Sequence, residues 1–599
     1  MLKRFLLNIL SSFVGTCVAI ALMTFSIILL FVGLAGSISM STDSVAESVK
    51  SRSILEIKLD GEIAERESAM EPSIMTVVQG NISAPQTLDV IVESIKEAAK
   101  NDNIAALYLN CGSPVAGAAT LDAIRHALLD FKKTTGGKKK IIAYGDSYTQ
   151  SAYFVASAAD EIHLNPAGGL DLHGLGTATP YFKGLLDKFG VQFQVVKVGT
   201  FKSAVEPYIL NEMSAPAKAQ LDTLLNSNWL YIRQQIADSR KGVSVSLIDT
   251  LINSDFIAFA KAEFSQKKGL VDSLTYGRDI KKRLAQLSGR EVKKLNIIKP
   301  STLVAQTPWS DGYSAKNRIA VLFACGEIAD GNSNQINFED LVPVINELAD
   351  DENVKGLVLR VNSPGGSVFG SDQIGEALDY FKSKGKPFAV SMGDYAASGG
   401  YWISCNADKI FAEPLTITGS IGIFGLIPNF KGTLDKLGVN IEGVSTNPEA
   451  NIMTGMKPLN ETQLAVVQKS VERGYFDFTS RVAQGRKMKR EQVLKIAEGR
   501  VWAAPSALKI GLVDSIAYLQ NAIEWAAVNA KVGKDYKVVA YPKVEPNFWS
   551  MMRSGAMTMA ELKAGLETGK EAVLRKYLLN RILQRKQIQA RMPEFRVNL

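Results

Sequence analysis

Histidine is scarce in this sequence, which contains only three in 599 residues. His126, His163 and His173 all precede the middle of the chain, and we interpret them as structural residues. The motifs HExxH, GxSxG and GxxxxGK[ST] are absent, so zinc-metalloprotease, α/β-hydrolase and P-loop chemistry have no support. A histidine-dependent mechanism is therefore nearly excluded.

Cysteine is also scarce, and the four cysteines form no CxxC pair, so neither a disulfide framework nor a zinc site is indicated. The chain is 46% hydrophobic and 21% charged, which is ordinary globular usage. Its net charge of +8 is small against 68 basic and 60 acidic residues. This balance indicates a mixed-sign surface and no nucleic-acid partner. The sequence predicts no cofactor and no metal.

Charge is missing from a long stretch near the N-terminus, between Arg4 and Asp43. Residues 5–36 are mostly apolar, and a bilayer core needs about 20 such residues, whereas a signal peptide has about 7–15. We therefore predict a membrane anchor within residues 1–45, although the small residues after the apolar run would also suit a cleavage site. Lys3 and Arg4 predict a cytoplasmic N-terminus, with the rest of the chain across the membrane.

The chain contains an internal repeat. Residues 145–154 (GDSYTQSAYF) match residues 393–402 (GDYAASGGYW) without a gap, at an offset of 248 residues. Flanking matches keep the same order, so we infer that one ancestral domain of more than two hundred residues has been duplicated. The flanking matches pair residues 61–64 with 326–329, 110–114 with 360–364, and 269–272 with 511–514.

Within each copy, short apolar or β-branched runs alternate with amphipathic stretches. This alternation predicts βαβ units with right-handed crossovers, and hence an α/β fold. Residues 286–317 contain two prolines and break both periodicities, as a linker does. In the basic tail, residues 571–591 have helical spacing. We expect this helix to pack on its own domain or its own oligomer, in preference to a membrane surface or a partner. The predicted domains are the anchor at 1–45, repeats at 46–285 and 318–541, the linker at 286–317 and the tail at 542–599.

The two copies differ at positions that can carry chemistry. The second copy has Ser398 followed by two glycines, and the first copy has Gln150 in place of that serine. Conversely, Lys202 in the first copy stands opposite Ala450 in the second. Taken singly, such a serine is also typical of a helix N-cap and such a lysine of the solvated surface. Their complementary distribution favours a shared function.

The chemistry explains why these residue types matter together. A serine hydroxyl is a weak nucleophile and needs an adjacent base. Lysine can be that base only where burial lowers its pKa from ~10.4 towards neutrality. Ser398 precedes a predicted helix, whose first N–H groups favour negative charge. The N–H of Gly399, with that of Gly365 or Gly366, is therefore predicted to form an oxyanion hole.

Three motifs of the second copy carry a family resemblance: residues 362–367 (NSPGGS), 394–401 (DYAASGGY) and 418–422 (TGSIG). Together they resemble the signal peptide peptidase A family, also called protease IV, in its long, duplicated, membrane-anchored form. The resemblance covers most of residues 53–541. The sequence departs from the family at residues 503–505 (AAP), where a Thr-Gly pair is expected, and this departure affects packing more than chemistry.

The resemblance implies tandem Clp-protease/crotonase-like domains and a dyad of Ser398 and Lys202 split between the repeats. It also implies that Ser420 orients the lysine amine. The implied substrates are remnant signal peptides, and the implied assembly is a homo-oligomer resembling a tetrameric ring. The implied location is the bacterial inner membrane, with a single-pass anchor and the catalytic part on the periplasmic side.

Two other classes of function stay open at this stage. One is a crotonase-like acyl-thioester enzyme, which the same fold allows. The other is a membrane scaffold whose degenerate site only binds peptides. The first has no use for a serine that faces a buried lysine, and the second has no need for an intact set of Ser398, Lys202 and Ser420.

Overall fold

The predicted anchor and most of the basic tail lie outside the residues that the structure describes. Across the described residues, no helix combines the length and the apolar character needed to cross a membrane. The computed structural model describes residues 49–66, 86–304, 309, 312–331, 335–447, 450, 452, 454–543 and 589–591.

The first repeat is built on a seven-stranded parallel sheet. Its order is β2-β1-β3-β4-β5-β7, and β8 pairs with β1. The central strands are almost continuously buried, as in a parallel sheet covered on both faces. The strands are β1 (Ser53–Ala64), β2 (Gln86–Thr87), β3 (Ile104–Val115), β4 (Lys140–Gly145), β5 (Glu161–Leu164), β7 (Ser273–Leu274) and β8 (Ile297–Ile298).

The second repeat is built on a sheet of the same kind. Its order is β18-β16-β14-β12-β9-β20, with β15 pairing with both β14 and β19. All pairs are parallel except β16 with β18. The strands are β9 (Arg318–Cys325), β12 (Val354–Ser363), β14 (Phe388–Ala397), β15 (Lys409–Ala412), β16 (Ile417–Gly419), β18 (Val501–Ala503), β19 (Ser515–Ile516) and β20 (Lys537–Tyr541).

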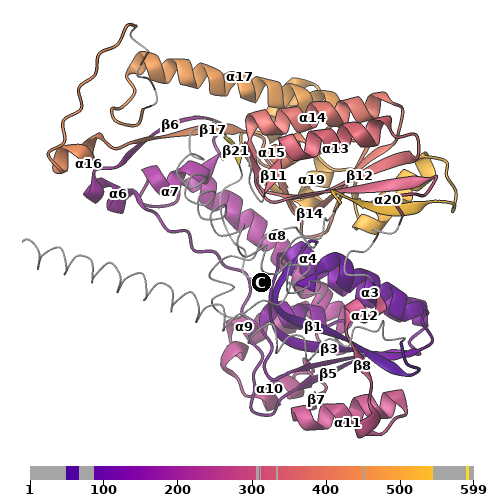
Figure 1. Ribbon diagram of the computed structural model, residues 1–599. Helices are drawn as coiled ribbons and strands as arrows, with labels where there is room; N and C mark the ends of the chain where they lie inside the picture. Colours follow the sequence, from indigo (N-terminus) through magenta and orange to yellow (C-terminus); the bar gives the residue numbers. More distant parts are fainter. Residues whose placement is uncertain are drawn as a thin grey trace, which may run out of the picture. The chain divides into compact units, whose positions relative to one another are not determined.

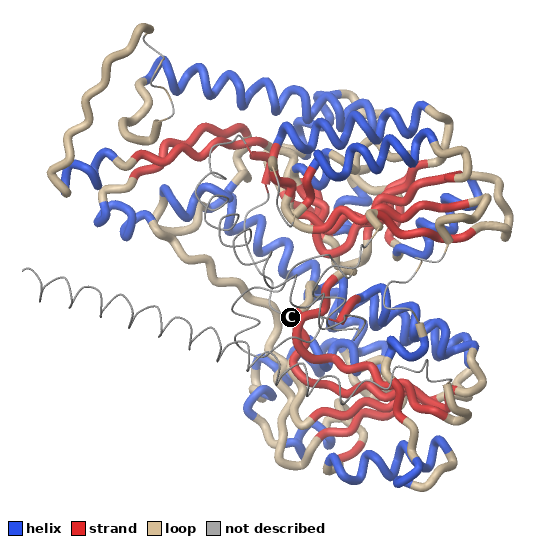
Figure 2. The backbone as a smooth tube through the Cα atoms, in the orientation of Figure 1, coloured by secondary structure: helices blue, strands red, loops and turns tan. Residues whose placement is uncertain are grey.

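The elements of the two repeats recur in the same order, which confirms the predicted duplication and the α/β class. The run β1-α3-β3-α4-β4-α5-β5 corresponds to β9-α13-β12-α14-β14-α15-β15, and α8 and α17 are both 25 residues long. Helices α13 and α14 lie side by side over the second sheet (Figures 1 and 2). The helices are α3 (Leu88–Lys100), α4 (Ala118–Thr135), α5 (Gln150–Ala156), α8 (Ala215–Ser239), α13 (Phe338–Asp350), α14 (Val368–Ser383), α15 (Gly399–Trp402) and α17 (Glu461–Gly485).

A third sheet contains strands from both repeats. Its order is β11-β10-β13-β21-β17-β6. Strand β6 of the first repeat pairs antiparallel with β17 of the second along seven residue pairs, and α17 packs across both strands (Figure 1). Val196 on β6 is buried in the core of the second repeat. The strands are β6 (Gln192–Val198), β10 (Ile328–Ala329), β11 (Ile336–Asn337), β13 (Gly365–Ser367), β17 (Ile423–Asn429) and β21 (Gln589–Arg591).

The segments predicted as a tail helix and as a linker each contain a strand. The helix predicted over residues 571–591 lies mostly outside the described residues, and its last three residues form the strand β21 instead, because two strand edges are available to pair with them. In the segment expected to be a linker, β8 pairs with β1, so the first sheet extends into residues 286–317.

Because Val196 joins the core across the repeat boundary, a charge there should destabilise the fold. We expect Val196→Asp to lower the free energy of unfolding by about 3 kcal/mol, since an unpaired carboxylate would be buried. Gln192→Asp, at the exposed end of the same strand, is the matched control and should change it little. Urea denaturation of both variants measures the change in the free energy of unfolding. Equal effects of the two changes would contradict the shared core.

Candidate active site

Ser398 occupies a sharp turn between β14 and α15. Its backbone has φ 56° and ψ −118°, a conformation that non-glycine residues rarely adopt and that stores about 1–3 kcal/mol of strain. Three hydrogen bonds hold the turn: the N–H of Ser398 donates to Gly419 O at 2.8 Å, and the carbonyl of Ser398 accepts from Tyr401 N and from Trp402 N, each at 2.9 Å. The hydroxyl is thus presented at the start of a helix.

Strand β13 lies against the first turn of α15 at Gly399, and at Gly366 it is packed closely on β10. A Cβ on Gly399 would lie 3.1 Å from Gly366 N, and a Cβ on Gly366 would lie 1.9 Å from Ile328 O. The N–H of Gly365 donates to Ser363 Oγ at 3.2 Å. The three glycines predicted for the oxyanion hole therefore lie beside Ser398.

Lys202 lies in the loop that follows β6 and is seated on the second repeat. The N–H of Phe201 donates to Glu498 O at 2.9 Å. A Cβ on Gly499 would lie 2.7 Å from the Cβ of Lys202, and a Cβ on Gly199 would lie 2.4 Å from the carbonyl carbon of Glu498. The close approach of these two backbones fixes where the lysine side chain begins.

The Lys202 amine lies within hydrogen-bond distance of both predicted serines. Its Nζ is 2.8 Å from Ser398 Oγ, and 3.1 Å from each of Ser420 O and Ser420 Oγ. All three side chains are fully buried, and burial lowers the pKa of Lys202 well below its usual value. A neutral amine has two N–H donors and one lone pair. The two Ser420 oxygens can accept hydrogen bonds from the two N–H groups of the neutral amine. The lone pair of the amine is then left to accept from the Ser398 hydroxyl.

Ser420 is anchored by the same loop that seats the lysine. Its N–H donates to Arg500 O at 2.7 Å, and its Oγ donates to Gly499 O at 3.4 Å. Its φ of 51° is again in the region that non-glycine residues rarely adopt. Ser420 therefore has a fixed position from which both of its oxygens face the Lys202 amine.

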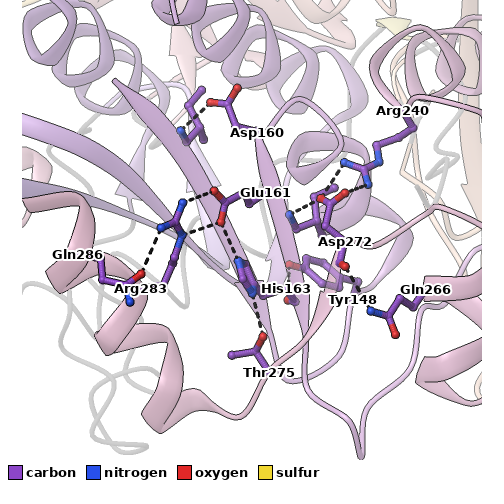
Figure 3. Close-up of polar contacts among 12 residues, drawn as sticks. Tyr148, Asp160, Glu161, His163, Arg240, Gln266, Asp272, Thr275, Arg283 and Gln286 are labelled. Carbon is purple, nitrogen blue, oxygen red and sulfur yellow. Dashed lines mark hydrogen bonds and ion pairs between the residues drawn. The ribbon is translucent and has the colours of Figure 1, made fainter. Parts of the chain in front are cut away.

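The histidines are used elsewhere. His163 on β5 lies in a polar network of the first repeat (Figure 3). Its Nδ1 is 2.8 Å from Thr275 Oγ1, and its Nε2 is 3.3 Å from a carboxylate oxygen of Glu161, which Arg283 binds with two hydrogen bonds. In the part of the chain that the structure describes, no histidine is hydrogen-bonded to the serine–lysine pair.

A contact that the sequence analysis missed holds the strand leading to Ser398. Helix α4 begins at Ala118, and its N-cap residue Gly117 has no side chain to cap it. The Asp394 carboxylate from the other repeat accepts instead from Thr120 N at 3.0 Å and from Thr120 Oγ1 at 2.6 Å. Asn362 Nδ2 also donates to this carboxylate, at 3.1 Å. Asp394 therefore caps a helix of the first repeat. The signal in the sequence that could have revealed this contact is the start of α4, where residues 117–119 (GAA) offer no side chain that can cap the helix.

A second missed contact is a buried triad of one arginine and two carboxyl groups. Arg360, on β12, binds Glu65 of the first repeat at 2.5 Å and Glu413 at 2.6 Å. Burial raises the pKa of Glu413 to about 8. The triad gives the repeats a second polar link, and its geometry penalises any relative displacement because a separated charge would stay buried.

Two segments of the chain, residues 133–291 and 380–533, match the Peptidase family S49. Together they exceed half of the sequence. The chain belongs to peptidase family S49. It is 38% identical over 451 residues to "Protease 4" of Haemophilus influenzae, covering 74% of this chain and 72% of that protein. It is therefore a serine protease of this family, as the sequence predicted.

A "Putative signal peptide peptidase SppA" of Enterococcus faecium is 34% identical over 256 residues, which are 42% of this chain and 74% of that protein. The match of most of a shorter relative to less than half of this chain agrees with the duplication. A solved ClpP1 variant chain from Listeria monocytogenes aligns with 34% of this chain and 94% of its own length, at 18% identity. Its TM-score of 0.24 is too low to assign a fold.

The buried lysine should leave a signature in the pH dependence of stability. The folded-state pKa of Lys202 lies below its unfolded value of ~10.4, so between the two values the unfolded chain binds more protons. We therefore expect wild type to gain stability relative to Lys202→Met as the pH is raised from about 7 to about 10. Chemical denaturation across this range measures the difference. Lys197→Met, on the preceding strand, is the control, and a pH-independent difference for Lys202→Met would contradict the account.

Proposed function

We propose that this protease hydrolyses peptide bonds with Ser398 as nucleophile and Lys202 as general base. The observation that carries the proposal is the 2.8 Å separation of Lys202 Nζ and Ser398 Oγ, between two fully buried side chains. The neutral amine takes the hydroxyl proton while Oγ attacks the substrate carbonyl. The resulting ammonium then gives that proton to the leaving amine, and the same amine activates water to release the acyl group.

We assign the oxyanion hole to the N–H groups of Gly399 and Gly366. Gly399 begins α15, and the first N–H groups of a helix have no acceptor within the helix. Gly366 is preferred to Gly365 as the second donor, because the N–H of Gly365 already donates to Ser363 Oγ. Loss of one such donor typically lowers the rate by ~10²–10³.

Ser420 acts in this proposal as a positioning residue. Its two oxygens occupy both N–H groups of the neutral Lys202 amine, so the lone pair is directed at Ser398. They also stabilise the ammonium that forms during the reaction, since a charged donor makes stronger hydrogen bonds.

The substrates in this proposal are unfolded, hydrophobic peptides, including remnant signal peptides. The full burial of Ser398 supports this class, because an extended peptide can enter where the loop of a folded protein cannot. The name of the relative from Enterococcus faecium, "Putative signal peptide peptidase SppA", also supports this class of substrate. An anchor in residues 1–45, the bacterial inner membrane and a ring-like homo-oligomer belong to the same proposal. The acyl-thioester and scaffold alternatives lose support because the family is one of peptidases.

Substitutions test the assigned roles. Ser398→Ala and Lys202→Ala should each reduce peptide hydrolysis to background without a change in fold, because each removes one half of the dyad. Ser420→Ala should lower kcat roughly tenfold, the effect of about 1.4 kcal/mol of lost hydrogen bonding. Steady-state kinetics with an unstructured peptide as substrate measure kcat for each variant. Ser265→Ala, an equally buried serine of the first repeat, is the control. Near-normal turnover by Lys202→Ala would refute the dyad.

Because both dyad residues belong to one chain, two inactive chains should not rescue each other. We expect co-expressed, full-length Ser398→Ala and Lys202→Ala chains to be inactive even when they purify as a mixed oligomer. Differently tagged chains and tandem affinity purification isolate that oligomer, and wild type co-expressed with Ser398→Ala is the positive control. Recovery of activity in the mixed oligomer would show that the lysine acts on a neighbouring chain.

A further inference from the structure

A cavity of about 200 Å³ lies between the two repeats, apart from the serine–lysine pair. Helices α3 and α4 of the first repeat contribute to its lining, and so does the start of α20 (Leu519–Asn529) in the second repeat. Ser398, Lys202 and Ser420 are not among the lining residues. Because an apolar cavity of about 150 Å³ is enough to bind benzene, this cavity can hold a slightly larger organic body.

The walls of this cavity are mostly apolar and partly aromatic. Trp309, Phe323 and Tyr518 all line it. The Tyr518 ring stacks on the ring of His126, with 3.8 Å between the ring centroids, so this part of the wall is built from both repeats. The faces of aromatic rings attract cations. The walls therefore suit a ligand that has an apolar body and a positive charge.

The charged residues of the lining are mostly acidic. Six of them carry carboxyl groups, against one lysine and one arginine. Both cations are already bound, since Lys96 Nζ lies 2.7 Å from a carboxylate oxygen of α3 and Arg360 belongs to the buried triad. An excess of negative charge is left to face a ligand. The six acidic residues are Glu65, Asp89, Glu93, Asp130, Glu413 and Glu524.

Two of these carboxyl groups are buried and incompletely bonded. Asp89 is 6% exposed and Glu413 is 1% exposed. Among the residues that the structure describes, Asp89 Oδ2 and Glu413 Oε2 have no hydrogen-bond partner. Burial raises the pKa of Asp89 to about 6, and the pKa of Glu413 is raised by the same cause. Buried polar atoms without a partner are costly, so both carboxyl groups favour a donor that enters from outside.

The cavity also reaches the surface. The side chains of His126 and Asp130, on α4, line it and are 39% and 59% exposed. The lining therefore extends from exposed residues of α4 to the buried carboxyl groups of Asp89 and Glu413. A small molecule can enter from the α4 side while the two repeats stay packed.

We propose that this cavity binds a small organic cation, which carries an ammonium group on an apolar body slightly larger than a benzene ring. The body packs against the aromatic walls, and the ammonium donates hydrogen bonds to Asp89 and Glu413. Arg66 would favour an anion instead, because its Nε and Nη2 have no hydrogen-bond partner among the described residues. However, its guanidinium lies over the Phe323 ring, and Arg66 does not line the cavity.

Isothermal titration calorimetry on the full chain tests the proposal. The probe is phenethylamine, and phenethyl alcohol and phenylacetate are ligands of similar size without the positive charge. We expect the amine to bind roughly tenfold more tightly than the alcohol, because only the amine forms charge-assisted hydrogen bonds. Phenylacetate should not bind, because the lining is acidic.

Two variants test the location of the site. Asp89→Asn keeps the shape of the side chain but removes its charge, and it should weaken amine binding roughly tenfold. Ala127→Leu adds volume at a buried lining position and should abolish binding. The matched control is Glu339→Gln, in the first turn of α13, the counterpart of α3; this residue is exposed and the variant should bind the amine as wild type does.

Equal affinities for the amine and the alcohol would overturn the proposal, and so would tighter binding of phenylacetate, which would assign recognition to Arg66. No measurable binding of the amine at millimolar concentration, or an affinity that Asp89→Asn and Ala127→Leu both leave unchanged, would also overturn it. Thermal unfolding shows that each variant is folded. The amine should raise the unfolding midpoint of wild type and of Ser398→Ala equally. An increase confined to wild type would place the amine in the peptidase site instead.

Discussion

The antiparallel pairing of β6 with β17 is the constraint on which the rest of the site depends. It joins the two repeats along seven residue pairs, from Ile423 with Val198 to Asn429 with Gln192. The loop after β6 carries Lys202, and the turn before β17 carries Ser420. One ladder of backbone hydrogen bonds thus sets the distance between an amine and a hydroxyl that are more than two hundred residues apart in sequence.

The remaining contacts make this placement rigid. The loop that carries Lys202 packs against residues 498–500, and the close approach of the two backbones requires Gly199 in one segment and Gly499 in the other. Asp394 caps a helix of the first repeat from the strand that ends at Ser398, and the triad around Arg360 adds a second buried link. Strained backbone at Ser398 and Ser420 persists because these contacts over-determine it. The cost of burying a lysine is tolerable only in such a frame, where its few partners are already in position.

The sequence alone predicted that Ser398 and Lys202 would meet, and the reason is the duplication. Two copies of one domain let each position be compared with its counterpart, so the loss of a serine in one copy and of a lysine in the other became visible. The structure brings Ser398 and Lys202 together as that comparison suggested, and it places Ser420 beside them as the family resemblance implied. Their catalytic roles and the domain boundaries remain proposals. The Clp-protease/crotonase-like likeness of the fold remains an expectation.

Other features of the structure could not be predicted, because no periodic pattern in the sequence indicates them. Strand β6 could be predicted as a strand, but its partner lies in the other repeat, and pairing across that distance depends on the whole fold. The contact of Asp394 with Thr120 joins two polar residues whose surroundings are known only once the repeats pack. Residues 571–591 have helical spacing, yet Gln589–Arg591 form a strand because two edges lie beside them. Local propensity yields to such tertiary pairing.

The central claim is that a buried, neutral Lys202 activates Ser398. The most direct measurement is the rate at which a fluorophosphonate labels the protein as a function of pH, with the modified residue mapped by mass spectrometry. The account predicts a single label on Ser398, a rate that rises with pH through a pKa below that of free lysine, and the loss of this rise in Lys202→Met. Labelling of another serine, or an unchanged pH profile in Lys202→Met, would contradict it.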